Sequence, residues 1–341
     1  MKLAIICFTR NGEVLCRKLM KETETISHQW EAYSTKEGTG LTFVASLSKW
    51  MTDVFETVDG IVFVGACGIA VRAIAPFLKS KTTDPAVVVL DEGGNFSISL
   101  LSGHIGGANA LAVELAKIVG AAPVITTATD VNKKFAVDVW AKKRELCIRS
   151  MTVAKHISAA VLDGEQIGIQ SDFPLETLPE GLLVTDDCNL GIVISLDEGK
   201  KPFKGTLTLV PKIVFLGMGC RKDSPMEKIE ALVLQVLKEH DISLFAIKAI
   251  CSIDLKQGEL GFLKLCKKYG WNFVTFTKDE LQKVAGDFAS SSFVESKVGV
   301  DNVCERAAVL ASGGDLVVKK IAKDGMTIAV AIKNWSVDFN E

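Results

Sequence analysis

The sequence predicts an α/β protein in which two α/β domains with mainly parallel sheets flank a small α+β middle domain. In the first third of the chain, short apolar runs alternate with segments of helical apolar spacing, as in the strand–helix units of a parallel sheet. The same alternation resumes in the last third, and between them closely spaced turn signals separate short strands. The 341 residues exceed what one core usually fills. We therefore expect an N-terminal domain at residues 1–136, a middle domain at 137–210 and a C-terminal domain at 211–341.

The elements of the N-terminal domain follow from its apolar pattern. Continuous apolar runs predict buried strands at residues 3–8, 60–64, 86–90 and 123–126, and helical spacing predicts helices at 12–21, 45–52 and 106–119. A short helix interrupted by Pro76 follows the second strand. The polar, glycine-containing segment 91–95 predicts a turn, and strand 96–100 would then form a hairpin with strand 86–90.

The C-terminal domain begins with an expected strand at 212–216, a glycine loop at 217–221 and a helix that starts near Pro225. Further strands are expected at 246–250, 272–276, 316–318 and 327–332. Thr277 and Glu280 have the spacing of a capping box, which marks the start of another helix.

Composition excludes several classes of protein. The formal charge of -2 gives no global positive field for nucleic acid or an anionic membrane. The longest uncharged stretch, residues 93–113, contains glycines and unpaired polar side chains that would be costly in lipid, so we expect no membrane span. Nine scattered cysteines without a CxxC pair form neither a disulfide framework nor a zinc spacing. A cytoplasmic protein without a metal site is the expectation.

Two segments combine a strand, glycines and an arginine. Backbone amides at a helix start attract anions, and glycine lets a ligand approach closely. The candidate ligand-binding residues are Gly65, Gly68 and Arg72 in one segment and Gly217, Gly219 and Arg221 in the other. Neither segment matches a Walker A or GxGxxG pattern, and a tight turn with a surface arginine explains them equally well.

Residues 91–109 form the richest polar segment. Its candidates lie at strand ends and at a helix start, where α/β folds place ligands: Asp91, Glu92, Ser102, His104, Gly106, Gly107 and Asn109. His104 could act as a general acid or base near neutral pH. The alternative is that His104 caps a helix and the carboxylates form a solvated turn. Ser102 and His104 cannot be taken as parts of a triad from adjacency, since triads are spatial.

A glycine loop that runs into a helix is expected again at 298–308. Asn302 and Glu305 could bind a ligand there, although Glu305 could equally cap the helix or pair with Arg306. Cys304 could be a nucleophile at the helix start, but its apolar surroundings favour a small buried residue.

Residues 65–72, 84–94 and 101–109 together resemble the N-terminal domain of the cobalt-precorrin-5A hydrolases. Residues 215–221 and 299–308 resemble the C-terminal domain of that family, in the same order. The resemblance implies that water opens a δ-lactone on a cobalt-containing tetrapyrrole, and that acetaldehyde leaves to give cobalt-precorrin-5B. It implies no separate cofactor, because the cobalt belongs to the corrinoid substrate. Transient contact with other enzymes of cobalamin biosynthesis would fit, without nucleic acid or membrane as a partner.

For this reaction we expect His104 or Glu92 to activate water, and amides near residues 106–107 or 65–68 to stabilise the oxyanion. Glu305 is the third catalytic candidate. Two other functions remain open from the residues: a nucleotide-binding or phosphosugar-binding α/β enzyme that uses the same glycine loops, and a non-catalytic corrinoid carrier or assembly protein.

Overall fold

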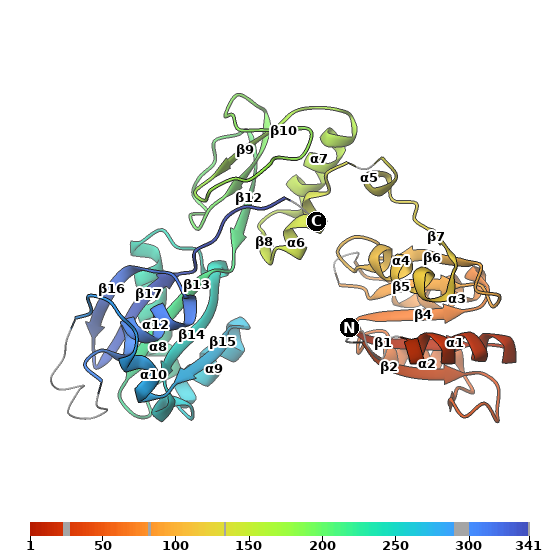
Figure 1. The fold of residues 1–341 in the computed structure, drawn as a ribbon, viewed down its shortest axis with the longest axis horizontal. Helices are drawn as coiled ribbons and strands as arrows, with labels where there is room; N and C mark the ends of the chain where they lie inside the picture. Colours follow the sequence, from red (N-terminus) through yellow and green to blue (C-terminus); the bar gives the residue numbers. More distant parts are fainter. Residues whose placement is uncertain (23–27, 81–82, 133, 290–299, 340–341) are drawn as a thin grey trace. The chain divides into compact units, whose positions relative to one another are not determined.

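The computed structural model describes residues 1–22, 28–80, 83–132, 134–289 and 300–339 (Figure 1). The chain forms two compact units, Met1–Val139 and Trp140–Glu341, and contains three sheets. The first two sheets are mainly parallel, and the third combines two parallel with two antiparallel strand pairs. Strands alternate with helices along the chain, which confirms the predicted α/β class. In the part of the chain that is described, no helix has both the length and the apolar character needed to cross a membrane.

The first unit contains a seven-stranded sheet with the order β3-β2-β1-β4-β5-β6-β7. Its strands are β1 (Lys2–Cys7), β2 (Gln29–Ser34), β3 (Thr42–Phe43), β4 (Gly60–Val64), β5 (Ala86–Leu90), β6 (Phe96–Leu101) and β7 (Ala122–Val124). Its helices are α1 (Arg10–Glu22), α2 (Leu47–Val54), α3 (Cys67–Ile74), the 3-10 turn η1 (Ala75–Phe77), α4 (Ala108–Val119), α5 (Ala128–Val131) and α6 (Val137–Lys143), which continues into the second unit.

Alternate residues of each central strand face opposite layers of helices. Leu3 and Ile5 pack with the α1 and α4 side chains Leu19 and Leu115, whereas Ile6 packs with the α2 side chain Trp50 on the other face. Because both faces of β1, β4 and β5 are covered, these strands are continuous apolar runs.

The direction of β6 decides where the polar loops lie. β5 and β6 are antiparallel, with Leu90 opposite Ser97 and Val87 opposite Leu101. The predicted hairpin is therefore confirmed. The loops after β1, β4 and β5 emerge at one edge of the sheet, which we call the carboxyl edge. The loop after β6 emerges at the opposite edge, the amino edge, beside the residues that precede β5.

The second unit contains two five-stranded sheets, with the orders β10-β9-β11-β12-β8 and β15-β14-β13-β17-β16. Their strands are β8 (Leu146–Ile148), β9 (Ile167–Ser171), β10 (Leu182–Leu183), β11 (Leu190–Ile194), β12 (Gly205–Pro211), β13 (Val214–Cys220), β14 (Ile247–Ile253), β15 (Asn272–Phe276), β16 (Asp315–Lys323) and β17 (Met326–Ile332). The helices are α7 (Met151–Leu162), α8 (Met226–Glu239), η2 (Leu244–Ala246), η3 (Asp254–Lys256), α9 (Leu260–Tyr269), α10 (Lys278–Gln282) and α12 (Val303–Ser312).

The two sheets of this unit share apolar packing. Val210 of β12 belongs to the core formed by β13, β14, α8 and α9, and Cys147 and Leu196 pack against it. The middle sheet is itself mainly parallel, with only β8 antiparallel to its neighbour β12. The sequence boundary at residue 211 thus falls inside one compact unit, because the cores on either side are continuous.

The expected glycine loop at 217–221 requires a correction. β13 continues through Gly217 and Gly219 to Cys220, and both glycines are strand residues. A Cβ atom on Gly217 would lie 1.7 Å from the backbone oxygen of Cys304 in α12. The glycine is therefore needed for the close approach of a helix to a strand, which the sequence pattern does not distinguish from a loop. The capping box of Thr277 and Glu280 is confirmed at α10.

Candidate active site

Glu92 lies at the carboxyl edge of the first sheet and is held by residues that follow β1. Thr9 Oγ1 donates a hydrogen bond to Glu92 Oε2 at 2.7 Å, and Asn11 Nδ2 lies 3.5 Å from Oε1. Thr9 Oγ1 also accepts a hydrogen bond from the backbone N–H of Gly12 at 3.0 Å. Thr9 and Asn11 lie in no motif that would predict a site from the sequence. Their signal was positional: the strand order changes direction between β1 and β4, and ligands bind at such points in α/β sheets.

Three other candidates of this domain lie around the same edge. The Gly65 N–H donates to Leu90 O, which ties the loop after β4 to the end of β5. Arg72 is exposed, and its Nη1 donates to Gly68 O within α3 at 3.2 Å. The Gly65 amide thus has a structural partner on the neighbouring strand, and the Arg72 side chain has one within its own helix while remaining exposed to solvent.

Asp91 ties the turn of the β5–β6 hairpin. Its carboxylate accepts hydrogen bonds from the Phe96 N–H at 2.6 Å and from Asn95 Nδ2 at 2.8 Å. Burial tends to raise the pKa of Asp91, but these donors outweigh it and hold the pKa below its usual range. Asp91 therefore stays ionised and stabilises the hairpin that sends β6 back to the amino edge.

A tight loop at the amino edge presents His104. Ser102 Oγ donates to Asp84 O at 3.1 Å, and a Cβ atom on Gly106 would lie 2.2 Å from Ser102 Cβ. Gly107 has a φ of 91°, a left-handed conformation that favours glycine, and its N–H donates to His104 O. The Gly107 amide is thus used within the loop rather than offered to an oxyanion.

Both ring nitrogens of His104 have polar neighbours. Nε2 lies 3.0 Å from Thr129 Oγ1 in α5, and Nδ1 lies 3.7 Å from Asp138 Oδ1 in α6. Thr129 and Asp138 are each only 5% exposed. A carboxylate can only accept hydrogen bonds, so the tautomer that suits this arrangement carries its proton on Nδ1 and accepts the Thr129 hydroxyl at Nε2.

His104 also lines a pocket of about 610 Å³. The other lining residues come mainly from α4 and the loops around it: Gly103, Gly107, Asn109, Ala110, Val113, Glu114, Lys117, Ile125, Val131 and Val139. The Asn109 side chain is held in place by two hydrogen bonds. Its Oδ1 accepts one from Ser99 Oγ at 2.6 Å, and its Nδ2 donates one to Thr127 Oγ1 at 3.0 Å. The pocket is therefore mostly apolar, with a few polar groups near His104, as ligand sites generally are.

The structure separates residues that the sequence analysis had grouped. His104, Ser102, Gly106, Gly107 and Asn109 come together at the amino edge, whereas Glu92, Asp91, Gly65 and Gly68 belong to the carboxyl edge. Because the length of a strand lies between them, His104 and Glu92 cannot act on the same bond. Across the residues that are described, no three His, Cys, Asp or Glu side chains are placed to hold a metal ion.

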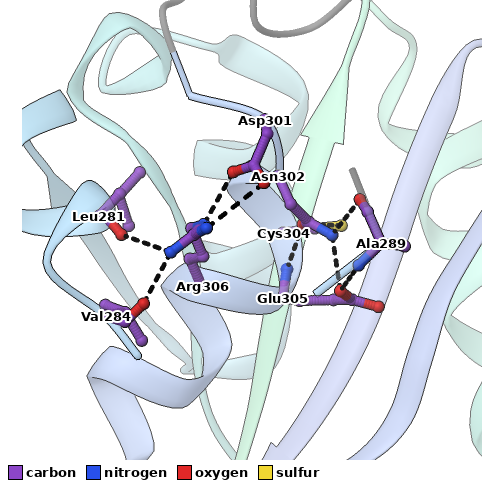
Figure 2. A network of polar contacts seen from close by, with 8 residues as sticks. All are labelled: Leu281, Val284, Ala289, Asp301, Asn302, Cys304, Glu305 and Arg306. Atoms are coloured by element: carbon purple, nitrogen blue, oxygen red, sulfur yellow. Dashed lines mark hydrogen bonds and ion pairs between the residues drawn. The ribbon is translucent and has the colours of Figure 1, made fainter. Parts of the chain in front are cut away.

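Asn302 and Glu305 are fully buried in the second unit. Figure 2 shows the polar contacts that surround them. The Glu305 carboxylate accepts hydrogen bonds from the backbone N–H groups of Ala289 and Lys320 and from Asn302 Nδ2, at 2.9, 2.6 and 2.6 Å. Asn302 caps α12 by accepting the Glu305 N–H. These contacts join α12 to β16 and to the backbone at Ala289, and they use both side chains internally.

Arg221 and Cys304, two further candidates of the C-terminal domain, contact neighbouring residues of the same domain. Arg221 donates its backbone N–H to Gly325 O, and its exposed side chain lies against Gly325. Burial raises the pKa of Cys304 to about 11, so its thiol is protonated at neutral pH and is a poor nucleophile. Gly299 lies outside the described residues.

The fold and the site define an α/β protein with a mainly apolar pocket beside His104, and comparison with known proteins shows its family. Three family models match successive parts of the chain: cobalamin synthesis G N-terminal over residues 49–130, cobalamin biosynthesis central region over 135–211, and cobalamin synthesis G C-terminus over 214–331. The chain belongs to the cobalamin synthesis G family, and the resemblance found in the sequence is confirmed.

Its relatives include two proteins described as cobalt-precorrin-5A hydrolase. The protein from Salmonella typhimurium is 35% identical over 97% of both chains. The protein from Priestia megaterium is 32% identical over 96% of this chain and 94% of its own. A solved structure of a cobalamin biosynthesis protein G homologue from Sulfolobus solfataricus covers 97% of both chains at 26% identity, with a TM-score of 0.43.

Proposed function

We propose that this protein is a cobalt-precorrin-5A hydrolase of cobalamin biosynthesis. Two relatives with that description align over nearly their whole length at 35% and 32% identity, which supports the substrate and the reaction. The reaction proposed is opening of the δ-lactone by water and release of acetaldehyde, leaving cobalt-precorrin-5B. Cobalt enters with the corrinoid, so we propose no cofactor bound to the protein itself. The nine cysteines, all free thiols, suit a reducing cytoplasm.

The position of His104 is the observation that supports its proposed role as the catalytic base. It lines the pocket at the amino edge, and it has Thr129 at one ring nitrogen and Asp138 at the other. A neutral imidazole with a carboxylate near its protonated nitrogen is a suitable proton acceptor at neutral pH. We therefore propose His104, rather than Glu92, as the base. Glu92 belongs to the opposite edge, where its carboxylate accepts the Thr9 hydroxyl.

The test is anaerobic incubation of the purified protein with cobalt-precorrin-5A, with acetaldehyde and corrinoid mass followed together. We expect acetaldehyde and a matching loss of mass. His104→Asn should lower kcat by roughly 10²–10⁴-fold, the range typical of general acid–base catalysis. Glu92→Gln, the matched control at the opposite edge, should change kcat by much less.

Two outcomes would contradict the proposal. Tight binding of cobalt-precorrin-5A without any turnover would indicate a corrinoid carrier or assembly protein. Full turnover by His104→Asn would remove His104 from the mechanism and direct attention to the carboxyl edge.

A further inference from the structure

We infer that Thr129, His104 and Asp138 form a nucleophile–base–carboxylate set, and that the lactone opens through a covalent ester on Thr129 Oγ1. This rests on the proposed function and deepens it. General-base activation of water needs a ring nitrogen directed at the water. Both nitrogens of His104 have protein partners instead, and the partner of Nε2 is a hydroxyl. The group that His104 is placed to deprotonate is therefore Thr129.

The geometry has the features of an activated hydroxyl. The Thr129 Oγ1 to His104 Nε2 distance of 3.0 Å is within hydrogen-bond reach, and a third group, Asp138, lies on the far side of the ring. At 3.7 Å the Asp138 contact is longer than a hydrogen bond, and it acts through charge on the Nδ1–H side. Because Asp138 is 5% exposed, its charge is weakly screened and favours the imidazolium that forms when His104 takes a proton.

The fold fixes each member of the set independently of the others. The turn at Gly106 and Gly107 holds His104. Helix α5 carries Thr129 two residues after Thr127, whose Oγ1 accepts a hydrogen bond from Asn109 Nδ2. Asp138 lies in the first turn of α6, where its Oδ1 accepts the Val139 N–H. Thr129 is also 5% exposed, and enclosure would protect an ester from premature hydrolysis.

The bonds and protons balance with one water and no other reactant. His104 Nε2 takes the Thr129 proton as Oγ1 bonds to the lactone carbonyl carbon. The bond from that carbon to the ring oxygen breaks, and the ring oxygen takes the proton from His104 to become a hydroxyl. His104 then takes a proton from water as the water oxygen attacks the ester carbon. The ester bond breaks, Oγ1 recovers its proton, and the acetate side chain leaves as the free acid.

The test uses the full chain, mixed anaerobically with cobalt-precorrin-5A and quenched in acid at intervals across a single turnover. We expect a corrinoid adduct on the peptide that contains Thr129. Thr129→Val keeps the shape but removes the hydroxyl, and it should lose the adduct and at least 10²-fold in kcat with little change in KM. Thr129→Ser should restore both. Thr126→Val, at an exposed threonine nearby, is the matched control and should behave like the unaltered protein.

Turnover by Thr129→Val within a few-fold of the unaltered protein, or the absence of an adduct throughout the turnover, would overturn the inference while leaving the hydrolase function intact. If the unaltered protein does not turn over cobalt-precorrin-5A, the proposed function fails instead. The set is then tested by itself with p-nitrophenyl acetate: acetylation of Thr129 that is lost in His104→Asn supports it, and no acetylation overturns it.

Discussion

Glu305 is an ionisable side chain that is completely buried and has no cation among its described partners. Its carboxylate is satisfied by two backbone N–H groups and the Asn302 amide. Donors of this kind stabilise a buried carboxylate, because they replace the hydrogen bonds that water would supply. Glu305 thus joins three segments of the C-terminal domain, and the catalytic role expected of it from the sequence stays a prediction.

Replacing Glu305 by Gln tests this structural function. The Gln amide would direct N–H groups toward other N–H groups and leave at least one donor unpaired. We expect the free energy of unfolding to fall by about 2–3 kcal/mol, the range for an unsatisfied buried group. Urea unfolding measures it, and Glu227→Gln, at an exposed residue in the first turn of α8, is the control. Equal stability of the two variants would show that the carboxylate is dispensable.

At the scale of elements, β13 and α12 pack so closely that Gly217 has no room for a side chain. Gly217→Ala should separate the two elements or unfold the domain, because the new methyl would lie 1.7 Å from Cys304 O. We expect a fall in melting temperature of several degrees or loss of folded protein. Gly258→Ala is the control, since a Cβ there meets nothing within 4 Å. A Gly217→Ala protein as stable as that control would contradict the packing described.

The elements predicted best from sequence include those buried on both faces. The predicted bounds of β4 and β5 agree with the structure, because a continuous apolar run has two clear ends. The predicted bounds of β15 also agree, although this strand is only partly buried. β2 was missed, since Gln29–Ser34 mixes polar and aromatic side chains and lies only half-buried. The end of β13 was missed because glycine within a strand looks like the start of a loop.

The same limit applies to the candidate site. His104 could be found because glycines and polar residues surround it in the sequence. Thr129 and Asp138 could not, since neither lies in a distinctive motif and both reach His104 only through the packing of α5 and α6. Thr9 is separated from Glu92 by 83 residues and meets it only because β1 and β5 both end at the carboxyl edge.

At the scale of the whole molecule, a polar cluster joins the two sheets of the second unit. Glu198 accepts hydrogen bonds from Arg149 Nε and Ser243 Oγ, and the Arg149 guanidinium lies 3.5 Å from the centre of the Phe245 ring. Burial tends to raise the pKa of Glu198, but the Ser243 hydroxyl and the Arg149 guanidinium outweigh it and lower the pKa.

A lowered pKa has a defined consequence for stability. The contribution of Glu198 is present above the unfolded-state pKa of about 4.3 and is lost as the pH falls through the lower folded-state value. Unfolding of Glu198→Gln in urea should therefore show a deficit against the unaltered protein at pH 7 that shrinks progressively below pH 4. Glu165→Gln, at an exposed site in the same unit, should show no such change. A stability deficit that does not change with pH would mean that the packing of the Glu198 side chain, rather than its charge, holds the two sheets together.

Because β6 reverses the direction of the chain, the residues of the pocket lie close together in the sequence. All three members of the inferred set lie between residues 104 and 138, in one uninterrupted stretch, whereas the carboxyl edge is assembled from residues around 9, 65 and 92. Genetic recombination between relatives can therefore transfer the set as a single block, with one crossover before Ser102 and another after α6. Chimaeras made at those two points would exchange the pocket between homologues without disturbing the opposite edge of the sheet.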